Sequence, residues 1–498
     1  MTTPHTTAPA GLLPARRVAR LRTGAINGEL ALVGALTLVA AALRFSTLDV
    51  QSFWHDEAVT AHRILRDSLF ATIGKVPGSE STPPLYYVLA WLWTRVFGIS
   101  EVGLRSLSAL IGTATVPVAY LAVRTLTPRR APALATAALA AVSPVLVWYS
   151  QEARAYVLLV LMGALSFLFF LRALRGRERR DLVWWAVVSA LALCTHYFAI
   201  FAVLPEAVWL LRSRVRGALP AVGAVAAVGA ALLPLAMHQA DQGHTSWISS
   251  IPLRTRVGDL LKEFVIGPSG SPTVGLSIVA GVLVAAALVL LALKSGARER
   301  LDARPPLIVG GVALLLPLAL AVVSLDYFFP RNLIAAWLPL AALVGLGCGL
   351  AAAQRVGALT AAALCCALLA ITISVNFNDR LQRPDWRGVA HALGHASGPR
   401  AIVVPATGDD PLEYYMPDTG RILRRHASVS EIDLAGWPVA GKRPPRFSGF
   451  QLVASERVKT FTLYRYRSDQ PRLVPRATLL ARHLGAERPA ALIQGVPQ

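Results

Sequence analysis

The chain has 498 residues, of which 55% are hydrophobic and 15% charged, whereas soluble domains are about 45–50% apolar and about 25% charged. Its 49 basic and 28 acidic residues give a net charge of +21, but the arginines stand in short clusters beside apolar blocks rather than on a nucleic-acid-binding face. The four cysteines lie within apolar stretches, which excludes a disulfide framework and a cysteine-rich zinc site. The composition predicts a multi-pass membrane protein that does not bind nucleic acid.

The first 27 residues are polar and basic, and no small-residue cleavage site follows the first apolar run. We therefore expect residues 1–27 to be a tail ahead of an uncleaved first span. Apolar segments near the length of a membrane helix, roughly 17–25 residues, predict eleven spans within a transmembrane domain over residues 28–375. They are 28–47, 103–123, 131–149, 154–173, 182–197, 198–211, 218–237, 274–293, 306–324, 332–351 and 356–375. The alternative for 182–211 is one tilted span.

Basic clusters occur in every second loop between these spans. Because arginine and lysine are retained on the cytoplasmic side, this alternation predicts a cytoplasmic N-terminus and an extracytoplasmic C-terminus. A single span at 182–211 would reverse everything after it. The arginine-rich, lysine-poor composition is typical of a high-GC bacterium, so we expect the plasma membrane of such a cell.

Three long segments then lie outside the cell: residues 48–102, 238–273 and 376–498. The last has strand-like runs at Ala401–Pro405 and Gly449–Tyr466. The predicted fold is an all-α polytopic membrane protein of about eleven helices, with helices in its extracytoplasmic loops and a small C-terminal α/β domain.

Two adjacent carboxylates, Asp56 and Glu57, follow Trp54 and His55 directly after the first span. Carboxylates at a membrane boundary are expensive to desolvate, which favours a catalytic base with a pKa adjusted by partial burial. The alternative is that they cap the next helix, an amphipathic one with Ala58, Ala61, Ile64, Leu65 and Leu69 on its apolar face. Further on, Pro83 and Pro84 precede an apolar run that is short for a span and is expected to lie flat or to re-enter the membrane.

Other polar residues lie at the predicted outer ends of spans. Arg154 stands where one span ends and the next begins, and suits either a phosphate clamp or an ion pair with Glu152. Arg331 lies in a similar aromatic setting, and His196 is either an interface residue or part of a site. Arg44 either snorkels to the interface or faces the same cavity. Glu206, within a span, is expected to pair with a neighbouring helix.

The ordered series WHDEA, STPPLYY, SALIG, SPVLVWYSQEARAY, THYFA, FFPRNLIAAWLPLAAL and RPDWRGVA resembles the bacterial branch of the GT-C membrane glycosyltransferases. These are the dolichyl-phosphate-mannose protein mannosyltransferase-like and aminoarabinose transferase-like enzymes. The resemblance covers roughly residues 28–390 and depends on the order of the motifs more than on any single one.

The resemblance implies a polyprenyl-phosphate sugar donor and an extracytoplasmic active site. It implies that Asp56 is the general base and that Glu57 positions a substrate. Arg154 and Arg331 would hold the lipid phosphate, with Tyr156, His196, Tyr197 and Arg44 as further substrate-binding candidates. The resemblance establishes no cofactor and leaves a divalent metal open. The expected partners are this donor, membrane lipids, and a glycolipid, polysaccharide or protein acceptor; mannose is the sugar expected at the level of the family.

A lipid-linked sugar flippase or transporter is the alternative function. Transporters place ionisable groups near the bilayer midplane and contain paired repeats. Here the ionisable residues gather at one face and no repeat is visible, which favours the transferase.

Overall fold

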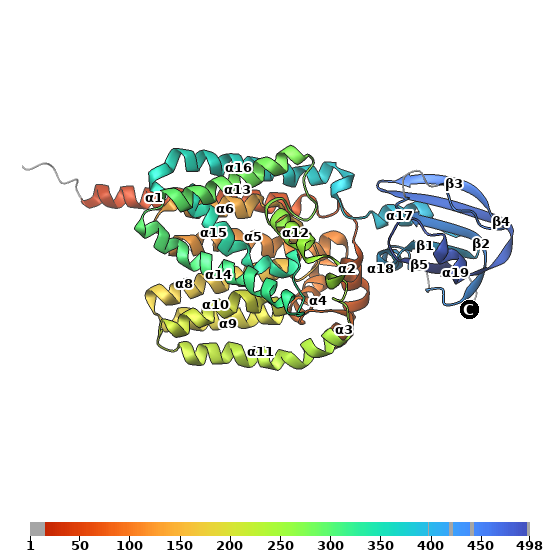
Figure 1. Cartoon of the computed structure of the whole chain (residues 1–498), viewed down its shortest axis with the longest axis horizontal. Coiled ribbons are helices and arrows are strands. Elements are labelled where there is room, and N and C mark those ends of the chain that lie inside the picture. Colours follow the sequence, from red (N-terminus) through yellow and green to blue (C-terminus); the bar gives the residue numbers. More distant parts are fainter. Residues whose placement is uncertain (1–14, 397, 418–421, 439–442, 496–498) are drawn as a thin grey trace, which may run out of the picture.

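The computed structural model describes residues 15–396, 398–417, 422–438 and 443–495. A helical bundle comes first, and a smaller part containing a β-sheet lies beyond one end of it (Figure 1). The helices of the bundle are α1 (Ala15–Phe45), α5 (Glu101–Leu126), α6 (Arg130–Val142), α7 (Pro144–Ser150), α8 (Tyr156–Gly176), α9 (Arg179–Thr195), α10 (Ile200–Arg212), α11 (Ala218–Asp241), α13 (Val274–Lys294), α14 (Ala297–Val322), α15 (Trp337–Cys348) and α16 (Gln354–Ser374).

Shorter helices connect them. They are α2 (His55–Ala58), the π-helical η1 (Val59–Ile64), α3 (Leu69–Ser79), α4 (Leu85–Phe97), η2 (Tyr197–Ala199), η3 (Ile248–Ser250), α12 (Leu253–Ile266), η4 (Pro330–Ala336), η5 (Ala351–Ala353), η6 (Val375–Phe377) and η7 (Asp379–Leu381). The helices α2, α3, α4 and α12 lie at the end of the bundle nearest the β-sheet (Figure 1).

Eight helical segments in the described part of the chain are long and apolar enough to cross a membrane, and the bent pair α6–α7, with a 50° break, makes a ninth. They correspond to nine of the eleven predicted spans, so the chain is a multi-pass membrane protein. The other two predicted spans are α9, with 17 residues, and α10, with 13. On the scale of roughly 17–25 residues, α9 is at the lower limit for a crossing and α10 is too short.

Residues 182–211 nevertheless form two helices that reverse direction at His196. The start of α8, the α9–α10 junction at His196 and the end of α11 at Gln239 all line the cavity near the β-sheet. The helices α8, α9, α10 and α11 therefore run alternately away from this cavity and back toward it. The alternative of one tilted span is therefore wrong. Glu206 on α10 accepts hydrogen bonds from Ser166 on α8 (2.5 Å) and Trp185 on α9 (2.9 Å), which confirms that it pairs with neighbouring helices.

The basic clusters gather at the opposite end of the bundle. Arg124 at the end of α5 pairs with Glu29 in the middle of α1. Arg129, just before α6, and Arg175 at the end of α8 pair with Glu299 and Asp302 at the start of α14. All these arginines thus share one end, as the alternation of charged loops predicts. The predicted tail lies partly outside the described residues, and residues 15–27 belong to α1.

The C-terminal part contains a five-stranded sheet in the order β3-β4-β2-β1-β5, in which β1 and β2 are parallel and the other pairs antiparallel. Its elements are α17 (Trp386–Leu393), β1 (Arg400–Pro405), η8 (Ala406–Gly408), α18 (Asp409–Tyr415), β2 (His426–Gly436), β3 (Gln451–Val458), β4 (Phe461–Pro475), α19 (Arg476–Ala481) and β5 (Pro489–Gln494). The first predicted strand is β1, and the second predicted run is the β3–β4 hairpin.

The segment after the first span differs from the predicted amphipathic helix. Ala58, Ala61, Ile64 and Leu65 are buried as expected, but the helix is one α-turn followed by a π-turn and ends at Ile64. No side chain caps its start, so the capping role considered for Asp56 and Glu57 is wrong. Its polar face contacts the C-terminal part, because His62 pairs with Glu413 and Arg63 with Asp410. Both faces of this segment therefore contact protein, although Arg63 stays partly exposed.

Candidate active site

A cavity of about 670 Å³ lies at the end of the bundle near the sheet. Its lining comes from the first loop, the starts of α4 and α8, the α9–α10 junction, the end of α11, the segment before α15, and the C-terminal part. The principal residues are Trp54, His55, Asp56, Glu80, Thr82, Arg154, Tyr156, His196, Tyr197, Gln239, Trp247, Tyr327, Arg331, Asn332 and Thr407. Six of the eight predicted site residues line this one space, and Glu57 and Arg44 do not.

Asp56 faces the cavity from α2 and is about one fifth exposed. Its Oδ2 lies 3.3 Å from Nη1 of Arg331, which is equally accessible. The other carboxylate oxygen, Oδ1, receives no hydrogen bond from the described part of the protein. Asp56 can therefore accept a proton from a molecule in the cavity, which is the first requirement for a general base.

Arg331 is surrounded by aromatic rings. Its guanidinium carbon lies 5.6 Å from the ring centre of Tyr156, 5.2 Å from Trp247 and 5.6 Å from Phe329. Contacts with ring faces stabilise a cation without occupying its N–H donors. Arg331 thus keeps donors available toward the cavity and can contact an anion there.

Arg154 is held differently, because both of its terminal nitrogens donate to Glu80 at 2.5 Å. It also donates to Oγ1 of Thr60 (3.2 Å) and lies near the backbone oxygen of Asp56 (3.4 Å). The ion pair considered with Glu152 is wrong. Glu80 was not predicted from the sequence, although it immediately precedes the STPPLYY motif. The signal was Arg154 itself, because an arginine on the outer side of the membrane does not follow the positive-inside rule and needs a counter-ion.

Two aromatic residues and a histidine complete this wall. The ring centres of His196 and Tyr156 are 6.0 Å apart, and Nδ1 of His196 accepts a hydrogen bond from the backbone N–H of Phe198 at 3.3 Å. Because Nδ1 accepts this hydrogen bond, a neutral His196 ring carries its proton on Nε2. The hydroxyl of Tyr197 donates to Gln239 at 2.7 Å, and Gln239 in turn donates to backbone oxygens of Val76 and Thr82.

Glu57 points away from the cavity and is completely buried. Arg105 contacts both of its oxygens, at 2.7 and 2.6 Å, and the backbone N–H of Ala153 donates to it at 2.9 Å. Arg105 also donates to the backbone oxygens of Leu48, Gln51 and Ser52. The pair therefore fixes the loop that carries Asp56. Arg105 lies near the start of a predicted span, and an arginine there is a sequence signal for a buried acidic partner.

Arg44 neither snorkels nor faces the cavity. It is fully buried and donates to Oγ of Ser150 and to the backbone oxygens of Ala40, Ala140 and Ala141. The carbonyls of Ala140 and Ala141 lie just before the break between α6 and α7, where the helix leaves oxygens without their usual partners. Arg44 thus stabilises the bent helix pair.

The C-terminal part holds the loop that carries Asp56 in place. Arg383 pairs with buried Glu152 at 3.0 Å and lies 3.9 Å above the ring of Trp148, while its backbone N–H donates to Gln51. Burial raises the pKa of Glu152 to about 7, partly offset by Arg383. Two further contacts follow along the loop: Trp386 N–H donates to Ser52 (3.0 Å) and Phe53 N–H donates to the hydroxyl of Tyr415 (2.7 Å).

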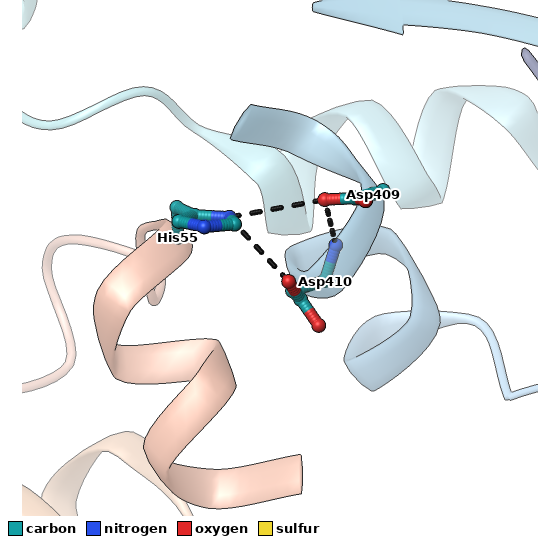
Figure 2. Close-up of side chains that lie close together, drawn as sticks. All are labelled: His55, Asp409 and Asp410. Carbon is teal, nitrogen blue, oxygen red and sulfur yellow. Dashed lines mark hydrogen bonds and ion pairs between the residues drawn. The ribbon is translucent and has the colours of Figure 1, made fainter. Parts of the chain in front are cut away.

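One group among the described residues has ligand atoms close enough together for a metal ion. His55 from α2 faces Asp409 and Asp410 at the start of α18, and the three ligand atoms lie within 4.8 Å of one another (Figure 2). Asp56 and Glu80 are carboxylates that line the cavity. Neither belongs to a group of this kind among the described residues.

Residues 81–238 match the family model described as dolichyl-phosphate-mannose-protein mannosyltransferase. The crystal structure of ArnT from Cupriavidus metallidurans in the apo state is similar, with 14% identity, 79% of this chain and 85% of that chain covered, and a TM-score of 0.54. The structure of the same protein bound to undecaprenyl phosphate aligns with 15% identity over 78% of this chain and 85% of that chain, with a TM-score of 0.52. No curated protein matches the chain by sequence.

At 14–15% identity, these structures show a shared fold over most of both chains. The family model covers the helices from α4 to α11, which surround the cavity. The chain therefore has an ArnT-like fold of the GT-C type, and its residues 81–238 resemble dolichyl-phosphate-mannose-protein mannosyltransferases.

Proposed function

We propose that the protein transfers a sugar from a polyprenyl-phosphate donor to an acceptor hydroxyl on the extracytoplasmic face of a bacterial plasma membrane. The observation that carries this proposal is the pair of Asp56 and Arg331, which places a carboxylate base and a cation 3.3 Å apart in one cavity. Transfer from a lipid phosphate needs these two groups, because one accepts a proton and the other neutralises the leaving phosphate.

Charge balance in the cavity favours Arg331 as the cation that binds the donor phosphate. Glu80 contacts both terminal nitrogens of Arg154, whereas Arg331 has one carboxylate contact among the described residues, to Asp56. An incoming phosphate would take over Nη1 of Arg331 and release Asp56 from its ion pair. Donor binding would thereby free the base at the moment when an acceptor needs it.

The reaction then takes one displacement. The acceptor oxygen attacks the anomeric carbon, its proton moves to Asp56, and the bond from that carbon to the phosphate oxygen breaks with both electrons going to the polyprenyl phosphate. Attack opposite the leaving group inverts the anomeric configuration, and no second carboxylic acid is required because phosphate is already a good leaving group.

The other site residues have supporting roles in this proposal. Tyr156, His196 and Tyr197 form the wall next to Arg331 and offer ring faces and polar atoms to the sugar. Arg154 supports the backbone of Asp56, and Glu57 positions the loop through Arg105 instead of touching a substrate. Mannose is the first sugar to test, because the matching family model names it.

Covalent transfer separates this proposal from a flippase or transporter. Right-side-out membrane vesicles containing the protein would be given labelled polyprenyl-phosphate mannose and, in parallel, the arabinose donor. We expect label in glycolipid, polysaccharide or protein with wild type, and none with Asp56→Asn. Asp67→Asn, which changes an exposed carboxylate outside the cavity, is the matched control and is expected to transfer normally. Movement of intact donor without transfer would contradict the proposal.

A further inference from the structure

The junction between the catalytic loop and the C-terminal part brings together three groups that bind metals. His55 precedes Asp56 on α2, and Asp409 and Asp410 begin α18, more than 350 positions later in the chain. Figure 2 shows the imidazole and the two carboxylates turned toward a common point. Convergence of three such side chains from two separate segments is unusual for residues that serve only to keep a surface soluble.

The distances do not describe hydrogen bonds. Nδ1 of His55 lies 3.5 Å from Oδ2 of Asp410 and 3.8 Å from Oδ1 of Asp409, whereas imidazole–carboxylate hydrogen bonds measure about 2.7–3.2 Å. Two ligands held about 2.1 Å from a tetrahedral zinc ion lie about 3.4 Å apart. The observed spacing therefore matches ligands arranged around a shared ion more closely than direct partners.

Burial and hydrogen bonding add a separate argument. Nδ1 of His55 is buried and has no hydrogen-bond partner, although the ring as a whole is about one third exposed toward the cavity. The carboxylate of Asp410 is almost fully buried, at 1% exposure, and its Oδ2 faces that nitrogen. A buried nitrogen without a partner is costly, and a metal ion would satisfy it.

The surrounding charges leave room for a cation. Arg63 contacts Oδ1 of Asp410 on the side away from His55. Oδ1 of Asp409 is held by the backbone N–H of Asp410 at 2.8 Å, so its position is fixed without a neutralising charge. Two carboxylates and an imidazole thus share one arginine.

We propose that His55, Asp409 and Asp410 bind a divalent cation that fastens the C-terminal part to the loop carrying Asp56. A ligand set of one imidazole nitrogen and two carboxylate oxygens suits Zn²⁺, with the fourth position taken by water. The exposed edge of His55 at the cavity gives the ion a route of entry. The ion would lie beside the reaction cavity, between two segments that must keep their relative positions.

The test is metal binding by the full-length protein in detergent, independent of any transferase activity. Wild type would be equilibrated with Zn²⁺ alone, separated from free metal by gel filtration and analysed for bound zinc. We expect one zinc per chain in wild type, loss of that zinc in His55→Gln and Asp409→Asn, and retention in Glu413→Gln. Glu413 is the matched control, because it is a carboxylate on the same helix whose partner is His62.

A second measurement protects the test from variants that fold poorly. Wild type is expected to unfold at a higher temperature with Zn²⁺ than with a chelator, and His55→Gln is expected to show no such difference. His55→Gln is informative even if the buried Asp410 tolerates no change, because its ring is partly exposed. Absence of bound zinc in wild type, or stoichiometric zinc in both ligand variants, would overturn the proposal.

Discussion

Asp56→Asn is expected to separate catalysis from donor binding. Loss of a positioned general base typically slows a reaction by about 10²–10⁴-fold, which is about 3–5 kcal/mol of activation free energy. The same substitution removes the counter-ion of Arg331, which lies 3.3 Å from Oδ2 of Asp56. A phosphate that binds Arg331 would then no longer have to displace a carboxylate.

The size of the second effect follows from the ion pair. At 3.3 Å the attraction between unit charges is about 1 kcal/mol in water and about 5 kcal/mol at an effective dielectric constant of about 20. Both side chains are about one fifth exposed, so solvent screening brings the net value toward the lower figure. Since about 1.4 kcal/mol corresponds to a tenfold change in affinity, Asp56→Asn should bind polyprenyl phosphate roughly tenfold more tightly.

Binding of undecaprenyl phosphate to the detergent-solubilised protein measures this directly, because the lipid carries no sugar and cannot turn over. Transfer of labelled sugar is measured in parallel on the same preparations. Asp67→Asn should match wild type in both assays, and Arg331→Gln should weaken lipid binding. Weaker lipid binding by Asp56→Asn, or transfer within tenfold of wild type, would refute the assignment of these two roles.

Two further predictions concern stability. Glu57→Gln breaks the buried pair with Arg105 and should lower the free energy of unfolding by about 3–5 kcal/mol, seen as a lower unfolding temperature; an unchanged midpoint would contradict a structural role for the pair. Glu263 on α12 has its pKa raised from 4.5 to about 7, first by burial and then by Asp259, so the native carboxyl keeps a proton that the unfolded one has lost. Stability should therefore fall as pH rises from about 4.5 to about 7, and Glu263→Gln should reduce that slope; equal slopes in both proteins would argue against it.

The sequence could predict which residues share the site, because the prediction needed only the ends of spans. Asp56, Arg154, His196 and Arg331 each lie where an apolar segment ends, and alternate spans bring such ends to one side of a membrane. The helical bundle and two of the strand regions were predictable for the same reason, since hydropathy and strand patterns are local properties.

Partners and orientations were not predictable, because they depend on rotation about helix axes. Neighbours on a helix point about 100° apart, so Asp56 faces the cavity while Glu57 faces the core. Nothing within the first loop indicates which of the two carboxylates faces the cavity and which is buried in the core. The partners Glu80 and Arg105 lie 74 and 48 positions from Arg154 and Glu57, respectively, and only the packing of the bundle brings them together.

Hydropathy divides the chain near residue 376, but the contacts of the loop that carries Asp56 cross that division. Gln51, Ser52 and Phe53 are held by residues beyond it, through Arg383, Trp386 and Tyr415. The cavity itself includes Thr407. A hydrogen-bonded loop end reduces the conformations available to Asp56, and a base contributes to catalysis only in the correct position. The C-terminal part therefore takes part in the site, because it holds the loop of Asp56 in place and adds Thr407 to the cavity lining.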